Sequence, residues 1–68
     1  MNKITMSEGT REKFIKIYSN LPLGIRQEII LVLEDGRPIT WNAAYVEVEA
    51  NTPLSNEILE KLEKLKII

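Results

Sequence analysis

The sequence predicts a small α+β domain in which helices cover a two-stranded antiparallel β-hairpin. The apolar run Ile29–Leu33 is followed closely by the turn dipeptide Asp35-Gly36. Apolar residues recur at helical spacing on both sides of this centre. A chain of 68 residues is enough for one domain, which we take as 1–68. The predicted order is an N-terminal helix, the hairpin and two C-terminal helices.

The N-terminal helix is predicted to begin between residues 6 and 11. The segment Thr5–Glu8 matches a capping box, and Ser7 and Thr10 are alternative caps. Asn20 and Pro22 end the helix, because proline cannot continue it. The apolar positions follow the i, i+3, i+4, i+7 pattern of one helix face: Phe14, Ile17, Tyr18 and Leu21.

The hairpin is predicted from strand and turn preferences. The run Ile29–Leu33 is short and rich in β-branched residues, which favours a buried strand. Asp35-Gly36 suits a two-residue type I′ turn, in which both central residues have positive φ. This register pairs Glu34 with Arg37 as opposite charges and directs the missing N–H of Pro38 toward the outer edge.

A helix over 22–34 is the alternative, since several apolar residues there also fit helical spacing, and it would make the chain an all-α bundle. In the strand interpretation, residues 21–27 form a turn or a single helical turn. Alternation along the strand then predicts Ile29, Leu31 and Leu33 on one face, with Ile30 and Val32 on the other.

Two helices are predicted after the hairpin. Thr40 is the N-cap of the first, over 41–50, although the alternation in 46–50 keeps a longer second strand open. Thr52 caps the last helix and Pro53 takes its first position. Glu57 and Glu60 each precede a lysine by four residues, the favourable order for an ion pair. Its apolar stripe consists of Leu54, Ile58, Leu62 and Leu65, with Leu59 beside it.

Composition argues against catalysis. The chain has no cysteine and no histidine, which removes disulfides, the common zinc sites, thiol nucleophiles and the usual general base. The neighbouring carboxylates Glu47 and Glu49 have no base, nucleophile or phosphate loop beside them. We therefore expect no enzyme activity, no catalytic residue, no metal site and no cofactor.

Charge distribution limits the classes of partner. The net charge is −1, with five basic and two acidic residues in 1–27 but one basic and seven acidic residues in 28–60. The acidic balance and a pI near 5.4 argue against nucleic-acid binding. No apolar stretch reaches membrane-spanning length and no secretory leader is evident, so we expect no membrane association and a cytoplasmic protein.

Small size favours association with another chain. Domains below about 70 to 80 residues rarely gain more than ~3 to 5 kcal/mol from one core. The free outer edge of the strand 28–34 would pair antiparallel with a second copy and give a homodimer. Residues 3–6 could instead add a third strand there and leave the monomer sufficient. The candidate interaction surface comprises Ile30, Val32, Arg37, Trp41 and Tyr45.

The aromatic residues Tyr18, Trp41 and Tyr45 could form a ligand site. Simple burial of these side chains is the favoured alternative, because a small core needs its large side chains.

The segments LPLGIRQE (21–28), the Asp-Gly turn and TWNAAYVEV (40–48) together resemble short uncharacterised prokaryotic proteins, some similar in size to antitoxins. The resemblance spans most of the chain, and it implies a partner-binding segment if the protein is antitoxin-like. We expect a protein-protein interaction or self-associating module. The rival is an antitoxin-like or nucleic-acid-binding regulator.

Overall fold

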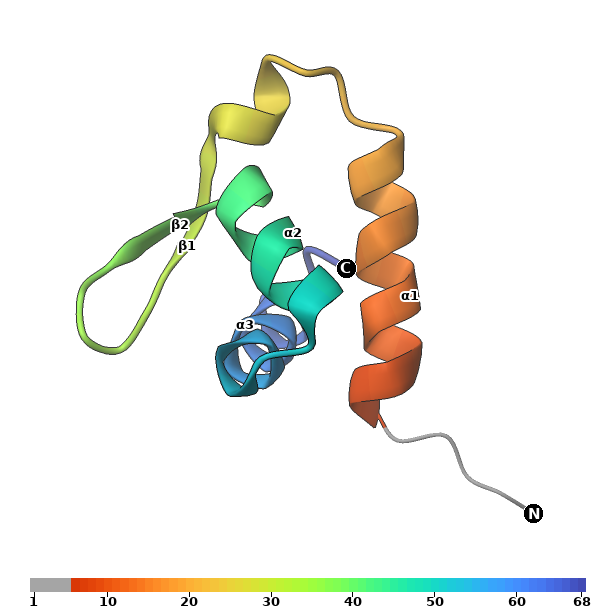
Figure 1. Cartoon of the computed structure of the whole chain (residues 1–68). Helices are drawn as coiled ribbons and strands as arrows, with labels where there is room; N and C mark the ends of the chain where they lie inside the picture. The colour runs from red at the N-terminus through yellow and green to blue at the C-terminus, as the bar shows by residue number, and fades with distance from the viewer. Residues whose placement is uncertain (1–5) are drawn as a thin grey trace.

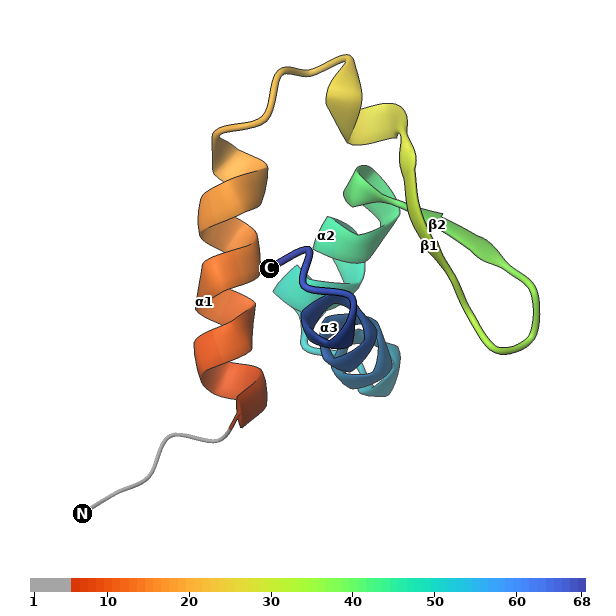
Figure 2. The ribbon, with the colours of Figure 1, turned by 180° about the vertical axis from the view of Figure 1, so that it is seen from behind.

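The computed structural model describes residues 6–68 and confirms the predicted α+β class. Helix α1 packs against α2 and α3, and the hairpin lies on the opposite side of these two helices (Figures 1 and 2). The hairpin loop extends beyond the helices (Figure 1). The elements are α1 (Met6–Ser19), the 3₁₀ helix η1 (Ile25–Gln27), β1 (Ile29–Val32), β2 (Pro38–Thr40), α2 (Trp41–Ala50) and α3 (Pro53–Lys64).

Helix α1 begins at Met6, inside the predicted interval, and ends at Ser19 as expected. The predicted cap at Thr5 and the proposed third strand at 3–6 fall at or beyond the limit of the described residues, and Met6 itself is helical. Carbonyl groups of the last turn accept hydrogen bonds from Ser19 Oγ, at 2.8 Å, and from Asn20 Nδ2, at 3.0 Å. The Asn20 amide thereby satisfies the Lys16 carbonyl, one of the last four that the end of a helix leaves without a helical partner.

The structure contains the predicted hairpin, but the predicted register between its strands was wrong by one residue. Val32, not Leu33, lies opposite Pro38. The Leu33 carbonyl accepts from Gly36 N at 2.9 Å and Leu33 N donates to the Arg37 carbonyl at 2.8 Å, so the loop has three residues, 34–36. Gly36 has φ 92° and no other residue of the hairpin has positive φ. A type I turn followed by a left-handed glycine meets this geometry, so the type I′ turn was also wrong.

The shifted register changes the ion pair at the turn. Arg37 does not pair with Glu34 as predicted but with Asp35, whose Oδ2 accepts from Arg37 Nε at 2.8 Å. Asp35 Oδ1 also accepts from the Arg37 backbone N–H at 3.1 Å. This backbone bond, followed by the Arg37 side chain, holds the pKa of Asp35 below its usual 3.8. Glu34 is thereby left free to face α3.

A bulge between Ile29 and Leu31 breaks the alternation of β1. Leu31 and Leu33 are buried as predicted, but Ile29, assigned to the same face, is 58% exposed. When two residues of one strand lie opposite a single residue of its partner, the side chains before the bulge point to the opposite face of the sheet. Ile30 accordingly turns partly inward and packs against the core.

Both C-terminal helices confirm their predicted caps. Thr40 Oγ1 accepts from Ala43 N at 3.0 Å, and Thr52 Oγ1 accepts from Ser55 N at 3.1 Å. The alternatives of a helix over 22–34 and of a longer second strand were therefore wrong. Asn51 joins the helices with φ 55°, a left-handed conformation that asparagine tolerates.

The core is a single cluster shared by all three helices and the hairpin. Phe14, Ala44, Val48, Ile58 and Leu62 have no exposed surface. One residue of the predicted α3 stripe was misplaced, because Leu65 is 59% exposed. Helix α3 ends at Lys64, and the chain turns back through Lys66, with φ 61°. Ile67 and Ile68 then pack against the core in its place.

Candidate functional site

The outer edge of β1 is the first candidate site. Within residues 6–68, β1 pairs only with β2. The N–H of Leu33 points toward β2 and donates to the Arg37 carbonyl. Along an antiparallel strand, the N–H and C=O groups of successive residues point alternately toward and away from the partner strand. The N–H and C=O of Val32 therefore point away from β2. An unpaired strand edge of this kind is a template for an added strand.

Exposed apolar side chains accompany this edge. Among the residues whose burial the structure describes, four of the six exposed large hydrophobic residues lie between positions 23 and 32. Leu23 lies in the connection from α1 to η1, and the other three belong to η1 and β1, which follow one another on the side of the molecule opposite α1 (Figure 1). Exposed apolar side chains gathered in one stretch of chain beside an open strand edge are candidates for an interaction surface. We call these four residues the apolar strip: Leu23, Ile25, Ile29 and Val32.

An aromatic stack joins α1, η1 and α2. The rings of Tyr18 and Tyr45 are parallel within 6°, with centroids 4.2 Å apart. The Arg26 guanidinium carbon lies 4.3 Å from the Tyr18 centroid, a cation-π contact. Tyr18 also donates its hydroxyl proton to Asn42 Oδ1 at 2.7 Å. The stack fixes η1, and with it the start of β1, on the helices.

Arg26 is held more by stacking than by hydrogen bonds. Its Nη2 donates to the Ser19 carbonyl at 3.4 Å, whereas its buried Nε has no acceptor among the described residues. Burying an unpaired donor costs free energy. The cation-π contact with Tyr18 offsets part of this cost.

Tyr45 makes the stack sensitive to alkaline pH. Burial, followed by repulsion from the Glu49 carboxylate, raises the pKa of Tyr45 above 10.0. The pKa is higher in the folded than in the unfolded chain, so the stability from the neutral phenol is present below pH 10.0 and lost as pH rises through the folded-state pKa. We expect the thermal midpoint to fall above pH 10.0 and to fall less in Tyr45→Phe. Identical alkaline slopes in thermal scans of the two proteins would contradict this assignment.

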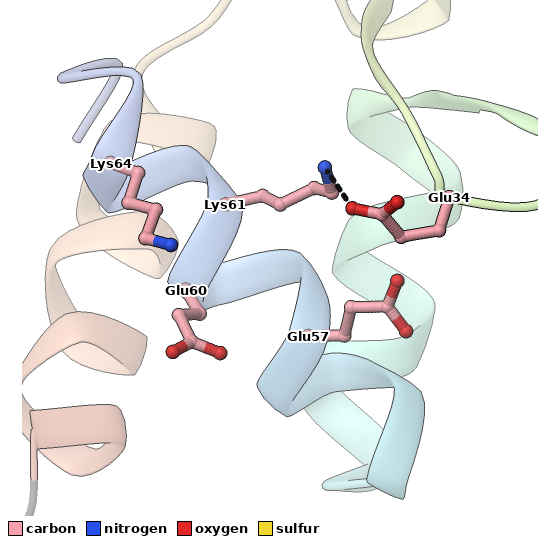
Figure 3. Close-up of a pocket in the computed structure, with 5 residues that line it drawn as sticks. All are labelled: Glu34, Glu57, Glu60, Lys61 and Lys64. Atoms are coloured by element: carbon pink, nitrogen blue, oxygen red, sulfur yellow. Dashed lines mark ion pairs between the residues drawn. The ribbon is translucent and has the colours of Figure 1, made fainter.

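A charged hollow of about 260 Å³ separates the hairpin loop from α3 (Figure 3). Lys61 Nζ lies 3.1 Å from Glu34 Oε2 and bridges its two sides. The predicted Glu57 to Lys61 pair is thus replaced by a contact between α3 and the hairpin. Glu57 points toward Glu34 across the hollow (Figure 3). The lining residues are Glu34, Glu57, Glu60, Lys61 and Lys64.

The structure divides the predicted interaction residues between two places. Val32 and Arg37 are exposed on the hairpin, where only Val32 belongs to the apolar strip. Trp41 is buried against Phe14, with ring centroids 5.7 Å apart, and Tyr45 is half-buried in the aromatic stack. Ile30 is half-buried against the core. Binding by these five residues stays a prediction.

Sequence reasoning missed Arg26 and most of the apolar strip. It grouped Arg37 with Trp41 and Tyr45 in the candidate interaction surface, but Arg37 is engaged at the turn and Arg26 stacks on Tyr18. The apolar residues Leu23 and Ile25 in a predicted turn were the available indication of an exposed surface. Only the bulge, which the sequence does not reveal, adds Ile29.

In comparisons with known proteins, no protein family, no curated protein and no solved structure matches the chain. The resemblance to antitoxin-sized proteins therefore stays a prediction. Among the described residues, no three or more acidic side chains are grouped so that they could hold a metal ion. Nor does any helix between residues 6 and 68 combine the length and apolarity needed to cross a membrane.

Proposed function

We propose that this chain is a small cytoplasmic interaction module without catalytic activity, which binds another protein or a second copy of itself through the outer edge of β1. The observation that carries the proposal is the open edge at Val32, flanked by the exposed side chains of the apolar strip. Main-chain bonds from an added strand would supply affinity, and the side chains would supply specificity. The absence of cysteine fits a reducing compartment.

Val32→Lys tests the proposal against a matched control. Val32 and Val46 are 54% and 62% exposed, so lysine at either site should change the free energy of unfolding by no more than about 0.5 kcal/mol. Only Val32→Lys should weaken association, by about tenfold, because it places a charge on the docking surface. Sedimentation velocity over a concentration series and capture from the native cell extract measure self-association and partner binding.

Two outcomes would oppose the proposal. Equal effects of the lysine substitutions at Val32 and Val46, or no association of the wild-type protein in either assay, would remove the role of the β1 edge. Salt-dependent binding of the wild-type protein to duplex DNA or RNA would instead support the rival regulator class, because such binding depends on counterion release.

A further inference from the structure

We infer that the occupant of the β1 edge is an extended segment of a different protein that carries a lysine or arginine at one end. This inference rests on the proposed function and specifies its partner. Its basis is that the open edge leads into the charged hollow, whose lining has more carboxylates than ammonium groups.

The edge and the hollow are continuous along the chain. Glu34 follows β1 after a single residue, and its carboxylate faces α3 (Figure 3). A strand that bonds to the outward N–H and C=O of Val32 would have one end beside Glu34, since consecutive strand residues advance about 3.3 Å. A terminal lysine or arginine has a flexible stem long enough to carry its charge into the hollow.

The charges of the hollow favour a cation. Lys61 is engaged by Glu34 at 3.1 Å. Glu60 and Lys64 lie on α3, farther from Glu34 than Lys61 does (Figure 3). They are four residues apart and therefore share one helix face. Glu60 and Lys64 form no ion pair with each other, and Glu57, which points toward Glu34, has no ion-pair partner among the described residues. The lining as a whole carries three carboxylates against two ammonium groups. A cationic side chain placed between Glu34 and Glu57 would therefore complete the charge balance.

The same charges disfavour a second copy. Glu28 directly precedes β1, and Glu34 follows it after a single residue. Antiparallel self-pairing centred on β1 therefore brings acidic residues of the two chains near one another at both ends of the pair. Like charges that face each other across paired strands are destabilising. A partner segment with a basic end avoids this conflict and still covers Ile29 and Val32.

Synthetic peptides test the inference on the intact chain. The probes are two short labelled peptides of alternating valine and threonine, one with a terminal lysine and the other with glutamate there. We expect fluorescence anisotropy to detect binding of the lysine peptide at concentrations up to about 1 mM, with the glutamate peptide about fivefold weaker or worse. The preference should shrink as salt is added, because the hollow is open to solvent.

Two glutamate variants locate the cation. Glu57→Gln should weaken the lysine peptide by about two- to fivefold, as expected for loss of an exposed ion pair, and should leave the glutamate peptide unweakened. Glu12→Gln is the matched control, because Glu12 is exposed and belongs to α1, the helix that lies across α2 and α3 from the hairpin (Figure 1). It should change the affinity of neither peptide.

Equal affinities of the two peptides, or no binding of either, would overturn the inference. A concentration-dependent dimer that Val32→Lys dissociates would overturn it too, because the occupant would then be a second copy, while the proposed function would stand. The proposed function itself fails if the lysine substitutions at Val32 and Val46 have equal effects on association, or if the wild-type protein associates in neither assay, so the two failures are distinguishable.

Discussion

Replacing Phe14 with alanine is expected to unfold most of the protein at room temperature. Phe14 has no exposed surface, and its ring lies 6.1 Å from that of Tyr18 and 5.7 Å from that of Trp41. Removing a buried phenylalanine side chain costs about 3 to 5 kcal/mol. A domain of this size rarely has more than ~3 to 5 kcal/mol of total stability. The loss is therefore comparable to the whole free energy of unfolding.

Urea titration followed by circular dichroism measures the effect, with Phe14→Leu as the control. Leucine keeps most of the buried volume, so this variant should retain a cooperative transition and lose only part of the stability. A Phe14→Ala protein that unfolds at nearly the wild-type urea concentration would show that Phe14 does not hold α1 onto α2. The aromatic contacts would then be a consequence of folding around other residues.

The second large effect separates two leucines of α3 that the sequence places on the same stripe. Leu62 has no exposed surface, whereas Leu65 is 59% exposed. Leu62→Ala should lower the free energy of unfolding by about 2 to 5 kcal/mol, and Leu65→Ala by no more than about 0.5 kcal/mol. Chemical denaturation of both variants provides the measurement. Similar losses in the two proteins would contradict the early end of α3.

Local sequence preferences predicted most of the fold because each acts over a few residues. Thr40, Thr52 and Pro53 mark helix starts through their own side chains. The strand 29–32 and the turn glycine were likewise found from residue type and spacing. These elements needed no knowledge of what they pack against.

The errors came from choices that depend on geometry between segments. Both a two-residue and a three-residue loop accept Gly36, so turn preference alone did not fix the register. The bulge near Ile30 and the reversal at Lys66 then moved Ile29 and Leu65 to the surface. The charged hollow and the Arg26 stack arise only when separate elements meet. The candidate site was therefore less predictable than the scaffold that carries it.

The two edges of the sheet differ in a way that limits the size of any assembly. Pro38 lies opposite Val32, so the same alternation that turns the Val32 N–H outward leaves no N–H on the outer edge of β2 at Pro38. The outer edge of β1 can accept hydrogen bonds from, and donate them to, an added strand, whereas Pro38 disfavours an added strand at the outer edge of β2. Sheets with two usable edges can grow into open-ended filaments. Under the proposed function, a strand added at β1 would therefore not be matched by one at β2, which suits a complex of defined composition.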